Sequence, residues 1–107
     1  MDKITHNDFE KWHSFSLSQQ MGNIGSEVSK IVRFKDTNNS RAEKSTVRAL
    51  ELIDLTIQSL VIKKRFPAVA EMLTHRELLC NFFYKGDSVT IPPEKLEKFY
   101  LSFYTGD

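Results

Sequence analysis

The stretch LSQQMGNIGSEVSKIV, residues 17–32, decides the fold class of this chain. Its large apolar residues recur at spacings of three and four, which places them on one stripe of an α-helix: Leu17, Met21, Ile24, Val28, Ile31 and Val32. Ahead of the stripe, Ser16 and Gln19 match a capping box, in which a serine hydroxyl accepts an early helical N–H and the glutamine side chain reaches back. The pattern predicts an amphipathic helix that begins after Ser16.

Three further helices are predicted after residue 32, separated by short connectors. After the polar segment DTNNS, residues 36–40, a helix is predicted over residues 40–63, and so short a connector predicts an antiparallel pair. Its main apolar stripe, widened by Leu52 and Leu55, is Val47, Leu50, Ile53, Ile57, Leu60 and Val61. Phe66-Pro67 begins a third helix, which ends near Gly86, and Pro92-Pro93 precedes a fourth that carries Leu96, Phe99, Tyr100 and Phe103.

These segments predict an all-α protein, an up-and-down four-helix bundle. Residues 1–107 are one domain's worth of chain, and one hydrophobic core is enough at this length. A short extra N-terminal helical segment is expected, capped by Asp8 and carrying Phe9 and Trp12 on one side. Whether residues 8–16 continue into the helix after Ser16 is left open by the pattern.

The composition excludes several classes of protein. Hydrophobic residues make up 40% and charged residues 27% of the chain, which favours neither disorder nor a membrane protein. The N-terminus lacks the basic and apolar regions of a secretory signal, so a cytoplasmic protein is expected. Cys80 is the only cysteine, which excludes an intramolecular disulfide and a thiolate metal cluster. No cofactor is expected.

Positive charge gathers in the middle of the chain. The net charge is +1, but residues 30–65 contain nine basic and four acidic residues, a balance of +5. Lys63, Lys64 and Arg65 follow the second helix, where cations complement the helix dipole. A second group surrounds the connector before that helix and is a candidate for binding nucleic acid by salt-dependent phosphate contacts: Arg33, Lys35, Arg41 and Lys44. The alternative is a solvated surface, which the small net charge favours.

Gly22 and Gly25 lie within the first long helix, where each glycine costs up to about 1 kcal/mol relative to alanine. Such a cost suggests close approach of a neighbouring helix, and the spacing matches neither of the Gly-rich phosphate loops. We expect both glycines to pack the helices over residues 17–32 and 40–63 tightly together.

Three other features suggest chemistry and each has a structural alternative. Glu10 and His13 have the Glu-x-x-His spacing of helical di-iron sites, but a second motif of this kind is missing, so no metal is predicted. His75 has the chemistry of a general base, yet no nucleophile motif surrounds it. Glu27 and Asp54 lie beside apolar stripes and need cationic partners, for which Lys30 and Arg48 are available.

The segment from Leu17-Ser-Gln-Gln-Met21 to Ile31, followed after a polar turn by residues 47–60, resembles the helical hairpin of the ribosomal-RNA intervening-sequence proteins. That family of small four-helix bundles includes accessory variability subunits of retroelements. The resemblance implies a four-helix bundle, assembly into rings and contact with nucleic acid.

The residues themselves favour a non-enzymatic module that associates with itself or with a protein partner. The chain holds one Trp, eight Phe and three Tyr, and aromatic residues concentrate in interfaces as well as cores. The alternative is a nucleic-acid-binding accessory protein that uses the basic connector end. No membrane partner is expected.

Overall fold

The computed structural model describes residues 6–86 and 92–105, and within these ranges it contains helices and no strand. The helices are α1 (His6–Ser14), α2 (Leu17–Phe34), α3 (Asn39–Ile62), α4 (Phe66–Tyr84) and α5 (Pro93–Thr105). The all-α prediction is therefore confirmed.

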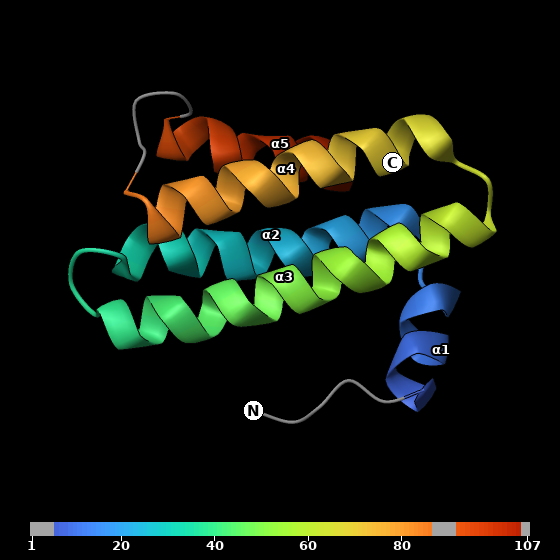
Figure 1. Cartoon of the computed structure of the whole chain (residues 1–107), viewed down its shortest axis with the longest axis horizontal. Helices are drawn as coiled ribbons and strands as arrows, with labels where there is room; N and C mark the ends of the chain where they lie inside the picture. Colours follow the sequence, from blue (N-terminus) through green and yellow to red (C-terminus); the bar gives the residue numbers. More distant parts are fainter. Residues whose placement is uncertain (1–5, 87–91, 106–107) are drawn as a thin grey trace.

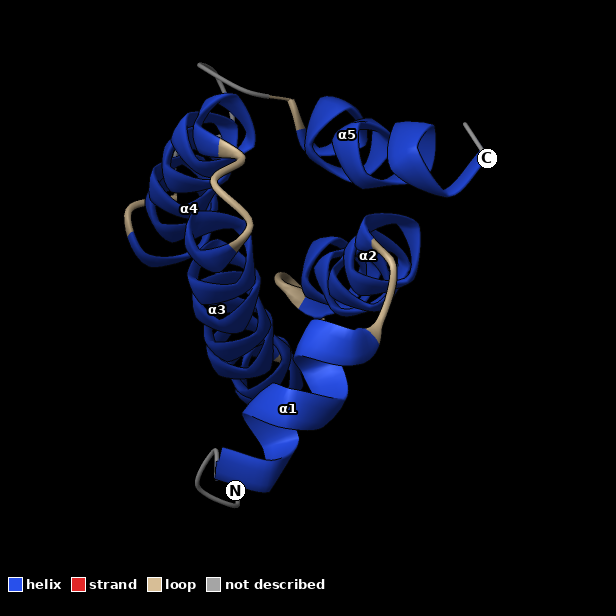
Figure 2. Ribbon diagram, turned by 90° about the vertical axis from the view of Figure 1, so that its right-hand side faces the viewer, coloured by secondary structure: helices blue, strands red, loops and turns tan. Residues whose placement is uncertain are grey.

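The four long helices run in alternating directions, as an up-and-down bundle requires (Figure 1). α2 and α3 form the central pair, α5 packs on α2, and α4 packs on α3. Figure 2 shows α4 above α3 and α5 above α2, with α1 below the central pair. α4 and α5 each pack mainly on one central helix, which leaves the outward side of α4 without a helical neighbour.

α1 and α2 are separate helices. The Ser16 hydroxyl accepts the N–H of Gln19 while the Gln19 side chain accepts the N–H of Ser16, so the predicted capping box is confirmed and it begins α2. α1 begins at His6, so Asp8 lies inside the helix and the prediction that Asp8 caps it is wrong. Trp12 connects α1 to α3, because its indole N–H donates to Thr56 Oγ1 at 2.9 Å.

The buried face of α3 matches the predicted stripe only in part, since Leu52, Ile53, Leu55 and Leu60 are buried as predicted and the others are not. Val47, Leu50 and Ile57 are only partly buried and Val61 is exposed. The core side of α3 instead includes small polar residues: Ser45, Thr46, Thr56 and Ser59. Both threonine hydroxyls donate to the carbonyl four residues earlier in the helix, which removes most of the cost of burying them. Because α3 contacts α1, α2 and α4, its core side is wider than one stripe.

Gly25 permits close approach of α5. A Cβ atom at Gly25 would lie 2.8 Å from Cβ of Tyr100, closer than two carbon atoms can sit. Tyr100 is 1% exposed, so its ring fills the space beside the glycine. The expected tight contact is therefore present at Gly25, but the helix that uses it is α5 and not α3. Gly22 is partly buried on α2.

The turn between α3 and α4 is a Schellman motif. The N–H of Arg65 bonds to the carbonyl of Leu60, and the N–H of Lys64 bonds to that of Val61. Lys64 adopts φ +58°, a left-handed conformation that glycine usually supplies at this position. The motif makes Arg65 the residue before α4, whose second position is Pro67, close to the predicted start.

Candidate functional site

An exposed apolar stripe runs along α4. Phe66, Leu73 and Tyr84 are 58%, 53% and 54% exposed. Their spacings of seven and eleven residues correspond to whole numbers of helical turns within about 20°, so the three side chains lie on one line along the helix. We call these three residues the α4 stripe. Val61 and Ile62, also exposed, lie at the adjoining end of α3.

The charges around the α4 stripe are divided along its length. Lys63 and Lys64 are exposed before α4 begins, and Glu77 is exposed in the second half of α4. Asp54 of α3 accepts hydrogen bonds from Nε and Nη2 of Arg76 at 2.8 and 3.3 Å. This bond to Asp54 is the main cause that raises the pKa of Arg76. Arg76 therefore secures the inner side of α4 to α3 and leaves the outer side to other contacts.

The abundance of aromatic residues suggested an interaction surface, but only some of these residues are exposed. Trp12, Phe82 and Tyr100 are buried, while Phe66 and Tyr84 are exposed. The α4 stripe was not predicted from the sequence, although its seven- and eleven-residue spacings are a signal for it.

The four basic candidates lie around the α2–α3 connector, and three of them rest on aromatic rings. The guanidinium carbons of Arg41 and Arg33 lie 4.1 and 5.8 Å from the ring centre of Phe34. Lys35 Nζ lies 4.5 Å from that of Phe82. Arg33, Arg41 and Lys44 are exposed, so their charges face solvent at this end of the bundle. The structure thus brings Arg33 and Arg41 together from two helices.

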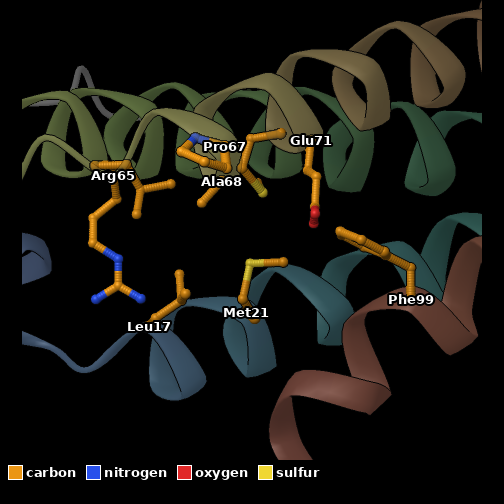
Figure 3. Close-up of a pocket in the computed structure, with 9 residues that line it drawn as sticks. Leu17, Met21, Arg65, Pro67, Ala68, Glu71 and Phe99 are labelled. Atoms are coloured by element: carbon orange, nitrogen blue, oxygen red, sulfur yellow. The ribbon is translucent and has the colours of Figure 1, made fainter.

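A pocket of about 410 Å³ opens between the start of α4, the start of α2 and α5. Buried Met21, Leu60 and Met72 form its apolar floor, and exposed Arg65 and Glu71 stand at its rim. Figure 3 shows Arg65 and Glu71 at opposite ends of this space. The sequence predicted Arg65 only as one of the cations at the end of the helix over residues 40–63. Local spacing does not show which residues of α2 and α5 lie opposite Arg65.

His75 is buried between α4 and α5. Its ring stacks on Phe99 with centres 3.5 Å apart, and Tyr100 contacts it edge-on. Burial lowers the pKa of His75 to about 4, and Nδ1 has no hydrogen-bond partner among the described residues. Burial raises the pKa of Tyr100 as well. A neutral imidazole packed in this way stabilises the fold, and the described residues beside it include no serine or cysteine nucleophile.

The remaining polar candidates have structural partners. Glu27 pairs with Lys30 one turn later in the same helix at 3.2 Å, although pairs between antiparallel helices were expected, and Asp54 pairs with Arg76 rather than with Arg48 or Lys30. His13 Nδ1 lies 2.7 Å from Ser59 Oγ, which ties α1 to α3. Within residues 6–86 and 92–105, no group of three or more His, Cys, Asp or Glu side chains is arranged to hold a metal.

No family model, curated protein or solved structure matches the chain. Among the described helices, none combines the length and the apolar composition that crossing a bilayer requires.

Proposed function

We propose that this protein is a non-enzymatic interaction module that associates with a second copy of itself through α4. The observation that supports this most is the α4 stripe: three large apolar side chains, each more than half exposed, on one line of a helix. Exposed apolar side chains scattered singly are ordinary, but an aligned set on a helix with one unpartnered side is typical of a helix–helix interface.

A second copy fits this surface because the stripe is complementary to itself. In an antiparallel pairing centred on Ala70, Phe66 of one copy lies beside Leu73 of the other. Lys63 precedes α4 and Glu77 lies in its second half, so the antiparallel pairing directs the basic start of one α4 toward the acidic half of the other. Ala70 is small and exposed, which allows the two helices to approach closely. A net charge of +1 adds little repulsion between copies.

The test is the mass of the protein in solution, measured by light scattering and sedimentation from low to high micromolar concentration. We expect a concentration-dependent dimer, and Leu73→Glu should make the protein monomeric. Because Leu73 is 53% exposed, the variant's unfolding midpoint should equal that of wild type at concentrations where wild type is monomeric. Gln58→Glu, an equal change at an exposed position of α3, is the matched control and should leave the dimer intact. A monomeric wild-type protein at high micromolar concentration contradicts the proposal.

The second candidate function is nucleic-acid binding through Arg33, Lys35, Arg41 and Lys44. The observation that favours it is the meeting of Arg33 and Arg41 around the exposed side of Phe34 at the α2–α3 connector. Such binding has to weaken steeply with salt, and Arg41→Glu with Lys44→Glu should abolish it. An RNA or DNA affinity that these changes leave untouched contradicts this candidate.

A further inference from the structure

The pocket at the start of α4 has the composition of a site for a small amphipathic ligand. Its volume of about 410 Å³ is within the usual range for ligand pockets, and its floor consists of buried methionine and leucine side chains. The accessible apolar lining comes from Leu17, Ala68 and Phe99, which are partly exposed. Met21 and Met72 are buried directly beneath this lining, and their flexible thioether side chains can adjust to a ligand.

Two opposite charges stand at the ends of this apolar space. Arg65 and Glu71 both line the pocket, and neither forms an ion pair with another residue in the part of the chain that the structure describes. In Figure 3 the guanidinium of Arg65 extends beside Leu17, and the carboxylate of Glu71 points toward the side of Phe99. The two ends of the pocket therefore select for different groups of one ligand.

The charge at the Arg65 end is the stronger of the two. Lys63 and Lys64 precede Arg65 directly, and the first turn of α4 begins here with no side chain capping it. Helix N-termini and guanidinium groups both favour a carboxylate, and Arg binds one with two parallel hydrogen bonds. The Glu71 end disfavours a second anion and accepts a hydrogen bond from a hydroxyl group.

The backbone spacing of Arg65 and Glu71 along α4 gives a scale for the length of the ligand's apolar chain. Glu71 follows Arg65 by six positions, which corresponds to a rise of about 9 Å along α4. An extended octanoate chain is close to this length.

We propose that this pocket binds a small carboxylate with an apolar chain, with the carboxylate on Arg65, the chain over Met21 and Met72, and a neutral or hydrogen-bond-donating end at Glu71. The charge on Arg65 selects the carboxylate, and the charge on Glu71 rejects a dicarboxylate of the same length. This inference does not rest on the proposed self-association.

The experiment is a titration of the full chain with octanoate, ω-hydroxyoctanoate and suberate, followed by methionine-methyl NMR. Met21 and Met72 are two of only three methionines in the chain, so their signals report on this pocket directly. We expect octanoate and ω-hydroxyoctanoate to shift both signals with a dissociation constant of about 0.1–1 mM, as befits so small a ligand. Suberate should bind about fivefold or more weakly.

Four variants separate the parts of the proposal. Arg65→Gln should weaken octanoate binding about tenfold, the size of a charge-assisted hydrogen bond, while Arg33→Gln removes the same charge elsewhere and should not. Glu71→Gln should abolish the discrimination against suberate. Ala68→Phe should block all three ligands by filling the pocket. Each variant's unfolding midpoint is measured alongside, so that loss of binding is read only from folded protein.

Three results would overturn the proposal. The first is the absence of a saturable methionine shift up to about 10 mM octanoate, a concentration well above the expected dissociation constant. The second is equal octanoate affinity for wild type and Arg65→Gln. The third is equal affinity of wild type for octanoate and suberate. Leu73→Glu should bind octanoate as wild type does, so failure of the self-association proposal is distinguishable from failure of this one.

Discussion

The imidazole of His75 lies flat against the ring of Phe99, with ring centres 3.5 Å apart and planes inclined by 19°. This contact joins α4 to α5, two helices that otherwise pack on different members of the central pair. His75 is 8% exposed, and its neutral form suits a site walled by aromatic rings.

Acid should therefore destabilise the protein through His75. Its pKa is about 4 in the folded chain and about 6.5 when unfolded, so the unfolded state binds the proton more tightly. The contribution of the neutral ring is complete above pH 6.5 and is lost as the pH falls toward 4, by up to about 3 kcal/mol. Urea unfolding at pH 7 and pH 4.5 measures this. His75→Phe should flatten the pH dependence, and an equally steep loss in that variant would assign it to other groups.

Replacing Gly25 by alanine should lower the free energy of unfolding by about 1–3 kcal/mol, because the new Cβ collides with Cβ of Tyr100. Intrinsic helix propensity alone predicts the opposite sign. The matched control is Ser26→Ala, one position later and exposed on the same helix, which should be neutral or slightly stabilising. Thermal or urea unfolding of both variants decides between propensity and packing.

Lys64→Gly should stabilise the protein by about 1 kcal/mol. Lys64 has φ +58°, where a side chain is strained and glycine is not. The neighbouring Lys63→Gly is the control, because Lys63 is in the right-handed region and should lose stability on the same change. Unfolding midpoints of the two variants in opposite directions would support the Schellman geometry. A loss in both would show that Lys64 contributes more through its side chain than its backbone costs.

Charge reversal tests the antiparallel arrangement of the proposed dimer. Lys63→Glu and Glu77→Lys should each weaken dimerisation about threefold or more, since each brings like charges together. The double variant restores the opposite pairing and should recover most of the affinity. Sedimentation of the four proteins at equal salt gives the dissociation constants. If the losses of dimerisation affinity add up in the double variant, Lys63 does not pair with Glu77. Leu73→Glu then tests whether α4 forms a dimer of a different arrangement.

The sequence pattern alone was sufficient for the local structure. Apolar spacing located the helices, and the Ser16 and Gln19 pair located the start of α2, because capping is a contact between residues three apart. Pro67 marked the start of α4 and Pro92-Pro93 that of α5, because proline suits the first turn of a helix. Gly86 marked the end of α4, and it has φ +66°, as expected for a residue after a helix.

The sequence pattern was insufficient where a residue's neighbour lies on another helix. Gly25 was expected to allow close approach of α3, but the helix that approaches it is α5. Asp54 was expected to pair with Arg48 or Lys30, but it pairs with Arg76. The predicted stripe of α3 was right for Ile53 and Leu60 and wrong for Val61, which is exposed, because the helix has three neighbours and its buried side does not follow one line.

What the sequence by itself determined is the class of the protein: an all-α chain whose helices begin and end at residues with local hydrogen-bonding or conformational reasons to be there. Only the tertiary structure decided which surfaces remain open. It left the α4 stripe exposed because α4 packs mainly on α3, and it brought Arg65 from the start of α4, Met21 from α2 and Phe99 from α5 to one pocket. Such groupings depend on the order and angle of packing, which arise from long-range contacts that no local pattern encodes.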